Sequence, residues 1–213
     1  MIEARDITFK YGRQLILKKI NISFDKGLHL IKGPNGSGKT TLCKVLSGLL
    51  RPFKGEVYID GVDIYREGNR DILSNIIYVH DKPIILNRSV YENIIFGAEI
   101  KNLDVSDIQY LINRFRLENI LNINALELSS GYKQLISILR ALTVKPRYLI
   151  LDEPFSGLDD EYREEVIDYI IRYSNKNTVL IATHTPYLDR EASTITYLNN
   201  GEIKKRVYRE LNN

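Results

Sequence analysis

The sequence of 213 residues has one cysteine, no long apolar run and little net charge. A single cysteine, Cys43, cannot form a disulfide within the chain, so a disulfide scaffold is excluded and a reducing, intracellular setting is favoured. No segment approaches the roughly 20 apolar residues of a membrane span, and residues 1–10 lack the apolar stretch of a signal peptide. We therefore expect another chain to cross any membrane that the protein serves.

Charge and composition exclude further classes of protein. The 30 Lys and Arg residues exceed the 27 Asp and Glu residues by only three, and both kinds are spread along the chain. Non-specific nucleic-acid binding is therefore not indicated, and no nucleic-acid partner is expected. A hydrophobic content of 44% excludes intrinsic disorder, and 13 glycines are too few for collagen. The chain is long enough for a substantial core.

The N-terminal third has the pattern of strands around one helix. Apolar and polar residues alternate through residues 1–25, with a turn at Gly12, as in half-buried antiparallel strands. A short apolar strand at 28–31 precedes a glycine-rich stretch and a helix that we expect at 39–50. A hairpin is predicted at 57–64. This part should form a small antiparallel sheet beside an α/β core.

The middle of the chain is predicted to be mainly helical. Ser89 with Glu92, and Ser106 with Gln109, match the capping box, in which a serine and the residue three positions later satisfy free backbone donors at a helix start. After the second box, apolar residues follow the spacing of one buried helical face. They are Ile108, Leu111, Ile112 and Phe115.

The last third returns to an α/β pattern. Short apolar runs at 148–151 and 179–182 are typical of buried parallel strands, and a helical pattern separates them. The turn at 199–201 predicts a terminal hairpin between strands at 194–198 and 202–207.

A phosphate-binding loop is predicted directly after the strand at 28–31. Residues 33–40 fit the pattern G-x-x-x-x-G-K-[ST] at every fixed position, and a helix follows. Its glycines let the backbone approach a phosphate closely, while free N–H groups, the helix start and Lys39 favour negative charge. Thr40 is placed to hold Mg²⁺. The candidate nucleotide-binding residues are Gly33, Asn35, Gly36, Ser37, Gly38, Lys39, Thr40 and Thr41.

Two carboxylates follow the buried strand at 148–151. Because the carboxyl ends of parallel strands meet at one edge, Asp152 should lie near the phosphate loop and orient water ligands of Mg²⁺. Glu153 can polarise the attacking water. Acidic residues at a strand end are common and by themselves indicate only a solvated end. The predicted phosphate loop on the same core favours a role for this pair in nucleotide chemistry.

The segment Leu128 to Gln134, LSSGYKQ, resembles the signature motif of ATP-binding cassette (ABC) proteins and lies upstream of Asp152, as in that family. The chain resembles the ABC nucleotide-binding domain over essentially its whole length. The resemblance implies an α/β fold: a RecA-like P-loop NTPase core with an antiparallel β subdomain and an inserted α-helical subdomain. Residues 1–82 and 143–213 would form the core with its β lobe, and about 83–142 the helical subdomain.

The resemblance also implies roles for single residues. Two cassettes would close head to tail on ATP and Mg²⁺, each phosphate loop facing the partner's signature segment. Glu153 would be the general base, Lys39 and His184 would contact the γ-phosphate, and Asp159 would lie in the D-loop. Tyr11 would stack on adenine. The signature residues that reach ATP in the opposite subunit would be Ser129, Ser130 and Gly131.

Three positions depart from the family pattern. Asp81 stands where the Q-loop has glutamine, and its carboxylate could still reach Mg²⁺. Ser130 and Tyr132 replace the usual glycine and glutamine of the signature and add bulk near the expected dimer interface. We expect slow to ordinary ATPase activity from such a site.

These features predict the ATP-hydrolysing subunit of an ABC transporter. It would act as a homodimer, or with a related cassette, on an integral membrane subunit, from the cytoplasmic face of the cell membrane. The alternatives are a soluble ABC ATPase and a slow ATP-driven clamp that is not coupled to transport. A P-loop kinase is disfavoured because residues 129–131, Asp159 and His184 have no role in its chemistry. Cargo and direction would reside in the membrane subunit.

Overall fold

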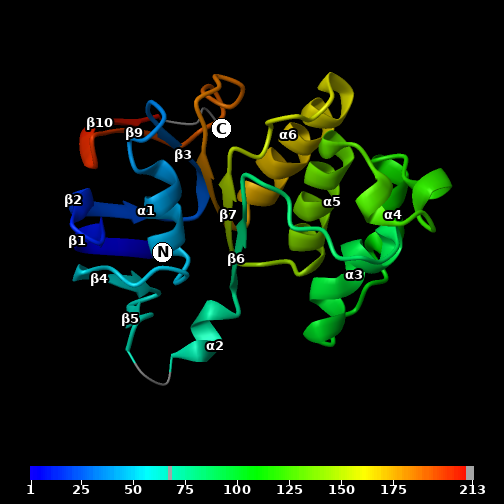
Figure 1. Cartoon of the computed structure of the whole chain (residues 1–213), viewed down its shortest axis with the longest axis horizontal. Helices are drawn as coiled ribbons and strands as arrows, with labels where there is room; N and C mark the ends of the chain where they lie inside the picture. Colours follow the sequence, from blue (N-terminus) through cyan, green and yellow to red (C-terminus); the bar gives the residue numbers. More distant parts are fainter. Residues whose placement is uncertain (67–68, 210–213) are drawn as a thin grey trace.

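The computed structural model describes residues 1–66 and 69–209, which form two sheets and the helices packed on them (Figure 1). The predicted α/β class is confirmed. The first sheet is antiparallel, in the order β2-β1-β4-β5. Its strands are β1 (Ile2–Tyr11), β2 (Gln14–Phe24), β4 (Lys54–Ile59) and β5 (Val62–Asp63). The turn predicted at Gly12 joins β1 to β2, with a φ of 56° that favours glycine.

The second sheet has the order β10-β9-β3-β8-β7-β6, and all its neighbours are parallel except β9 and β10. Its strands are β3 (Gly27–Lys32), β6 (Ile76–Val79), β7 (Tyr148–Asp152), β8 (Thr178–Ala182), β9 (Thr194–Asn199) and β10 (Glu202–Tyr208). The carboxyl ends of β3, β6, β7 and β8 therefore meet at one edge, and the segments that follow these strands carry the candidate site.

Six α-helices and two short 3-10 helices lie in the described residues. They are α1 (Lys39–Leu46), α2 (Arg70–Leu73), α3 (Val90–Ile100), α4 (Ile108–Arg114), η1 (Glu118–Ile120), η2 (Ala125–Glu127), α5 (Ser130–Thr143) and α6 (Asp160–Ser174). No described helix combines the length and the apolar character that crossing a bilayer requires.

Side chains of the parallel strands alternate between two apolar clusters because successive residues of a strand point to opposite faces. Ile150 belongs to a cluster with α1 and the antiparallel sheet, so α1 lies between the two sheets. Leu149 and Leu151 belong to the cluster formed with α3, α4, α5 and α6 on the other face. The sheet thus separates the helix after the phosphate loop from the helix that carries the signature segment (Figure 1).

The structure corrects two local predictions. The helix expected to reach residue 50 ends at Leu46, and Gly48 follows with a left-handed φ of 80°. The capping box predicted at Ser106 is wrong, because the Ser106 N–H donates to the carboxylate of Asp104 and the Gln109 side chain bonds to Asn113 instead. Helix α4 instead begins after Asp107, without a side-chain cap.

Two other predictions for the helical region are confirmed. The box of Ser89 and Glu92 is present in both directions at the start of α3. The apolar face predicted for α4 is buried, with exposed fractions of 8% or less at Ile108, Leu111, Ile112 and Phe115.

Candidate functional site

The glycine-rich loop runs from the end of β3 to the start of α1. Gly38 precedes the helix with a φ of 104°, and Gly36 has a φ of 76°, so both adopt backbone conformations that favour glycine. A Cβ on Gly33 would lie 2.0 Å from the carbonyl oxygen of Leu198, at the end of β9. Larger residues are therefore excluded at the point where the loop leaves the sheet.

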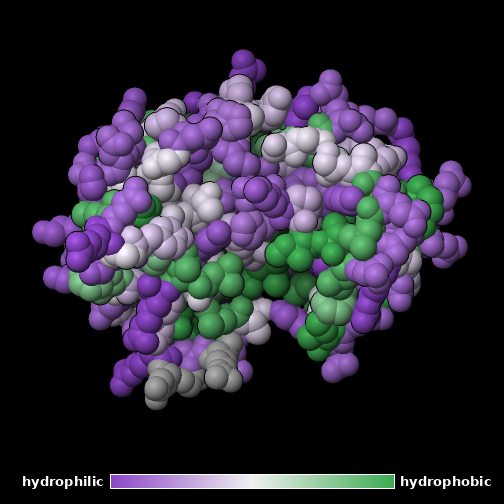
Figure 2. Space-filling view, viewed as in Figure 1, coloured by the Kyte–Doolittle hydropathy of each residue, from purple (hydrophilic) through white to green (hydrophobic). Residues whose placement is uncertain are grey.

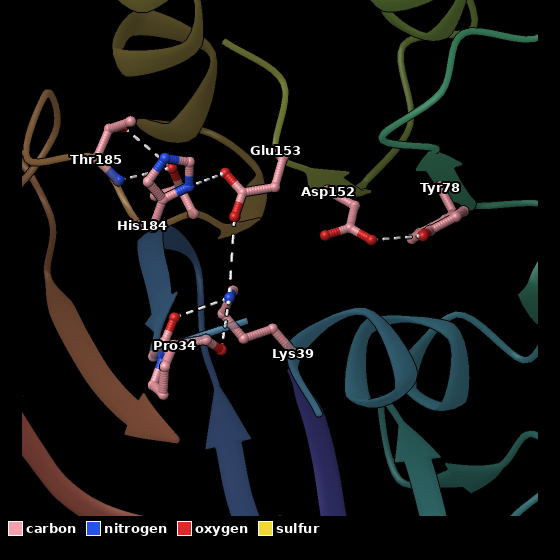
Figure 3. A network of polar contacts seen from close by, with 9 residues as sticks. Pro34, Lys39, Tyr78, Asp152, Glu153, His184 and Thr185 are labelled. Atoms are coloured by element: carbon pink, nitrogen blue, oxygen red, sulfur yellow. Dashed lines mark hydrogen bonds and ion pairs between the residues drawn. The ribbon is translucent and has the colours of Figure 1, made fainter. Parts of the chain in front are cut away.

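Lys39 is held inside this loop. Its ammonium donates to the carbonyl oxygens of Gly33 at 2.8 Å and Pro34 at 3.3 Å, and only 6% of the residue is exposed (Figure 3). The same Nζ lies 3.9 Å from Oε1 of Glu153. One buried cation therefore stands between the loop backbone and the carboxylate that follows β7.

The loop borders a pocket of about 390 Å³. Its lining residues are Gln14, Ile16, Asn35, Gly36, Ser37, Gly38, Lys39, Thr40, Thr41, Asp81 and Glu153. The pocket brings together the predicted phosphate loop, the predicted general base Glu153, and Asp81, which stands where the family pattern has glutamine. Asp81 is exposed there, and its Oδ1 lies 2.6 Å from Nδ1 of His80.

Two lining residues, Gln14 and Ile16, were not predicted. They belong to β2 of the antiparallel sheet, and the β9–β10 turn lies against both β2 and the glycine-rich loop. In that turn, the N–H of Gly201 donates to the carbonyl of Ser37 in the loop at 3.0 Å. The carbonyl of Gly201 accepts from the backbone N–H of Lys18 on β2. Nothing in the alternating pattern of β2 distinguishes these residues from ordinary strand residues.

Asp152 ends β7 and is fully buried. The hydroxyl of Tyr78, on β6, donates to its Oδ2 at 3.0 Å, while Oδ1 has no hydrogen-bond partner among the described residues (Figure 3). Burial raises the pKa of Asp152 above its usual range, and the charges of Asp81 and Glu153 add to this effect. Burial likewise raises the pKa of Tyr78, with the negative charge of Asp152 as a further cause.

The unpartnered oxygen of Asp152 fits a cation. A buried carboxylate oxygen without a donor is costly, and a divalent ion beside Thr40 would satisfy it. No group of three or more His, Cys, Asp or Glu side chains in the described residues could hold a metal ion. Mg²⁺ at nucleotide sites commonly takes ligands from one or two carboxylates, substrate phosphates and water.

Glu153 has an unusual backbone conformation for its residue type. Its φ is 44°, and its N–H donates to the carbonyl of Ala182 at 2.8 Å. Such left-handed residues cost free energy and concentrate at functional sites. Oε2 lies 3.0 Å from Nδ1 of His184, whose side chain is 64% exposed (Figure 3). The carboxylate thus has a lysine on one side and an accessible imidazole on the other, so it can accept a proton from water at the pocket.

The signature residues lie away from this pocket in the same chain. Ser129 caps α5, its Oγ accepting from the N–H of Tyr132 at 3.3 Å, and Ser130 is exposed beside it. Gly131 packs so closely on residue Gly157 that a Cβ would lie 2.5 Å from its carbonyl oxygen. Helix α5 is on the face of the sheet opposite α1, so one chain does not bring these residues to its own loop (Figure 1).

Two further candidates lie outside the pocket lining. Tyr11, at the end of β1, is 51% exposed and packs edge-on against Phe9 with ring centroids 4.9 Å apart. Asp159 precedes α6 and is exposed, without a side-chain capping hydrogen bond.

Comparisons with known proteins agree on one family. Residues 17–156 match the family model described as ABC transporter. The chain is 36% identical over 215 residues to a putative ABC transporter ATP-binding protein of Pyrococcus horikoshii, covering 96% of this chain and 82% of that protein. It is 35% identical to the tungstate uptake system ATP-binding protein of Peptoclostridium acidaminophilum, covering 95% and 96% respectively.

Solved structures show the same fold. An ATP-binding subunit of an ABC transporter matches with a TM-score of 0.89 and 26% identity, over 98% of this chain and 90% of that one. A dimeric ATP-binding cassette in a post-hydrolysis state, bound to ADP and Pi, matches with a TM-score of 0.86 and 25% identity. That match covers 99% of this chain and 100% of the cassette.

Proposed function

Because the chain belongs to the ABC transporter family of ATP-binding proteins, we propose that it drives a separate membrane-spanning subunit from the cytoplasmic face, using ATP bound at the Lys39 loop. The protein binds and hydrolyses ATP, and ATP-binding subunits of this family dimerise and work with membrane subunits. The observation that carries the site assignment is the convergence of three groups. Glu153 lies 3.9 Å from Lys39 and 3.0 Å from His184 at the mouth of the loop pocket.

Binding of the triphosphate is assigned to the loop backbone and Lys39. Loop N–H groups and the start of α1 face the phosphates, and Lys39 exchanges the carbonyls of Gly33 and Pro34 for phosphate oxygens. Thr40 and Asp152 would hold Mg²⁺, which when bound neutralises charge on the phosphates. Asp81 lines the same pocket, and its carboxylate is within the proposed metal environment.

Hydrolysis is assigned to Glu153 and His184. The carboxylate of Glu153 accepts a proton from the water that attacks the γ-phosphorus in line, while the bond to the β–γ bridging oxygen breaks and ADP leaves. His184 contacts Glu153 through Nδ1, and its exposed imidazole would also contact the γ-phosphate, which orients the carboxylate toward the reacting group. Lys39 stabilises negative charge that develops on the transferred group.

The remaining candidates belong to the closed dimer in this proposal. Ser129, Ser130 and Gly131 face the γ-phosphate of the opposite subunit from the exposed start of α5, where the helix dipole favours negative charge. Asp159 is also exposed, two residues after the Gly157 that contacts Gly131. Tyr11 stacks on adenine. Residues 1–82 and 143–213 act as the core, and about 83–142 as the helical subdomain that carries the signature.

An apolar groove supplies the contact with the membrane subunit. Figure 2 shows hydrophobic surface around a hollow at the lower centre of this face. The groove has a volume of about 400 Å³, and Leu49 and Ile84 on its walls are 60% and 64% exposed. Its lining residues are Leu49, Ile77, Tyr78, Val79, His80, Ile84, Phe96, Gly97, Ser137, Arg140, Ala141 and Val144. An amphipathic helix of the membrane subunit is the occupant that we propose.

Groove contact is tested by co-purification from native membranes under mild detergent. The wild-type chain is expected to retain a polytopic membrane protein in stoichiometric amount, and Ile84→Asp to lose it because a charge would enter the apolar contact. Leu103→Asp is the matched control, since Leu103 is exposed but lines none of the described pockets around the groove. Both variants should unfold at the wild-type temperature. Stoichiometric recovery of ribosomal or DNA-associated proteins instead would contradict the transport proposal.

The contact between Tyr78 and Asp152 predicts an effect on metal affinity. Tyr78→Phe removes the donor to Oδ2, so the carboxylate loses its fixed orientation, and affinity for the metal should fall about 10- to 100-fold. Mn²⁺ binding in the presence of ATP, followed by electron paramagnetic resonance, measures this without turnover. Tyr58→Phe is the control, because Tyr58 donates to the exposed carboxylate of Glu56. Unchanged Mn²⁺ affinity in Tyr78→Phe would remove Asp152 from the metal site.

A further inference from the structure

Two tyrosines connect the first turns of α5 and α6. The hydroxyl oxygens of Tyr132 and Tyr162 lie 2.9 Å apart, and their ring centroids are separated by 5.3 Å. Both side chains are half-buried against the core of the helical region. Burial raises the pKa of Tyr162 to about 12, with the Tyr132 hydrogen bond as the next cause, so the Tyr162 phenol stays protonated near neutral pH. We call these two residues the tyrosine pair.

A second contact lies beside the tyrosine pair. Gly131 packs on the carbonyl of Gly157, and a Cβ at position 131 would come within 2.5 Å of that oxygen. Leu158 and Phe155 anchor the same segment, because only 6% and 5% of these residues are exposed. The start of α5 is thus joined to residues 157–162 by a backbone contact and by a side-chain hydrogen bond.

The joined segment leads directly to the proposed general base. The N–H of Ser156 donates to the carbonyl of Glu153 at 3.2 Å, and the N–H of Leu158 donates to Phe155 at 3.4 Å. Consecutive turns therefore run from Glu153 to the start of α6. Under the proposed function, Glu153 serves the ATP held by its own loop, whereas Ser129 and Gly131 serve the ATP of the opposite subunit.

We infer that the hydrogen bond of the tyrosine pair is a positioning contact that couples the two ATP sites of the dimer. It makes the signature segment at 129–131 and the segment from Glu153 to Asp159 move together. Closure of the signature segment on one ATP then adjusts the base at the other. This inference rests on the proposed function, because it requires two chains to share two ATP molecules. Tyr132 and Tyr162 act through Ser129 and Glu153 and touch no substrate themselves.

The test is a double-mutant cycle of Tyr132→Phe, Tyr162→Phe and the variant with both changes. Each single change removes the same hydrogen bond, so kcat should fall about fivefold in each, the factor that one neutral hydrogen bond contributes. The double variant should be no slower than either single one. The Hill coefficient for ATP should fall toward 1 in all three, while ATP affinity of the monomer stays at the wild-type value. Tyr197→Phe, which removes an exposed phenol hydroxyl from β9, should leave every parameter unchanged.

Several results would overturn the inference. If the fold-losses in kcat of the two single variants multiply in the double variant, the two hydroxyls act separately. A wild-type Hill coefficient in the variants would mean that the tyrosine pair does not couple the two ATP sites. If a variant folds poorly, hydrogen exchange of wild-type protein decides the question. ATP-induced dimerisation should protect amides at 129–133 and at 156–160 to the same extent, and protection of only one segment refutes the coupling. A wild-type chain that forms no dimer with ATP would refute the proposed function itself.

Discussion

Glu153→Gln is expected to lower the rate of ATP hydrolysis at least about a hundredfold, the lower range of general-base contributions, while ATP still binds. The amide cannot accept the proton of the attacking water, yet it keeps the length and shape of the side chain. Lys39, which lies 3.9 Å from the carboxylate, keeps its two loop carbonyls and remains available to phosphate. Under the proposed function hydrolysis reopens the dimer, so the variant should also accumulate as an ATP-bound dimer.

Phosphate release measures the rate, and light scattering after gel filtration with ATP and Mg²⁺ measures the dimer. Glu99→Gln is the control, since Glu99 is exposed on α3 and its substitution removes the same charge from the chain. Hydrolysis within about threefold of wild type, well below the expected general-base factor, would show that another group accepts the proton. Loss of ATP binding would instead show that Glu153 maintains the loop.

Lys39→Ala is expected to weaken ATP binding about 10²- to 10⁴-fold. Hydrogen bonds from a charged group contribute about 1.5–3 kcal/mol each, and Lys39 can make two to phosphate oxygens in place of its two carbonyl contacts. Only 6% of the residue is exposed, so the ammonium lies inside the loop rather than in solvent. Calorimetric titration with a slowly hydrolysed ATP analogue gives the affinity directly.

Lys44→Ala provides the comparison, because Lys44 lies in the last turn of the same helix and is half-buried. It should bind the analogue with wild-type affinity. Thermal unfolding without nucleotide separates binding from folding, since Lys39→Ala also loses the contacts that close the loop. If Lys39→Ala binds the analogue with wild-type affinity, the phosphates do not bind at the Lys39 loop.

Local patterns predicted the elements of this protein well where neighbours in sequence also decide the structure. The alternation in residues 1–25 produced β1 and β2, and the box of Ser89 and Glu92 begins α3 because both partners lie within one turn. The box at Ser106 failed for an equally local reason. Asp104 accepts the Ser106 N–H that a capping box would pair with Gln109, and the helix begins after Asp107 rather than after the serine.

The sequence by itself determined the glycine-rich loop, the carboxylates Asp152 and Glu153 at the end of β7 and the segment LSSGYKQ, because each depends on residue types at short fixed spacings. Only the tertiary structure decided that Tyr78 holds Asp152, that Gln14 and Ile16 line the pocket, and that Tyr132 meets Tyr162. These contacts join residues on different strands and helices. Their pairing depends on how two sheets and their helices pack, and no spacing along the chain records that packing.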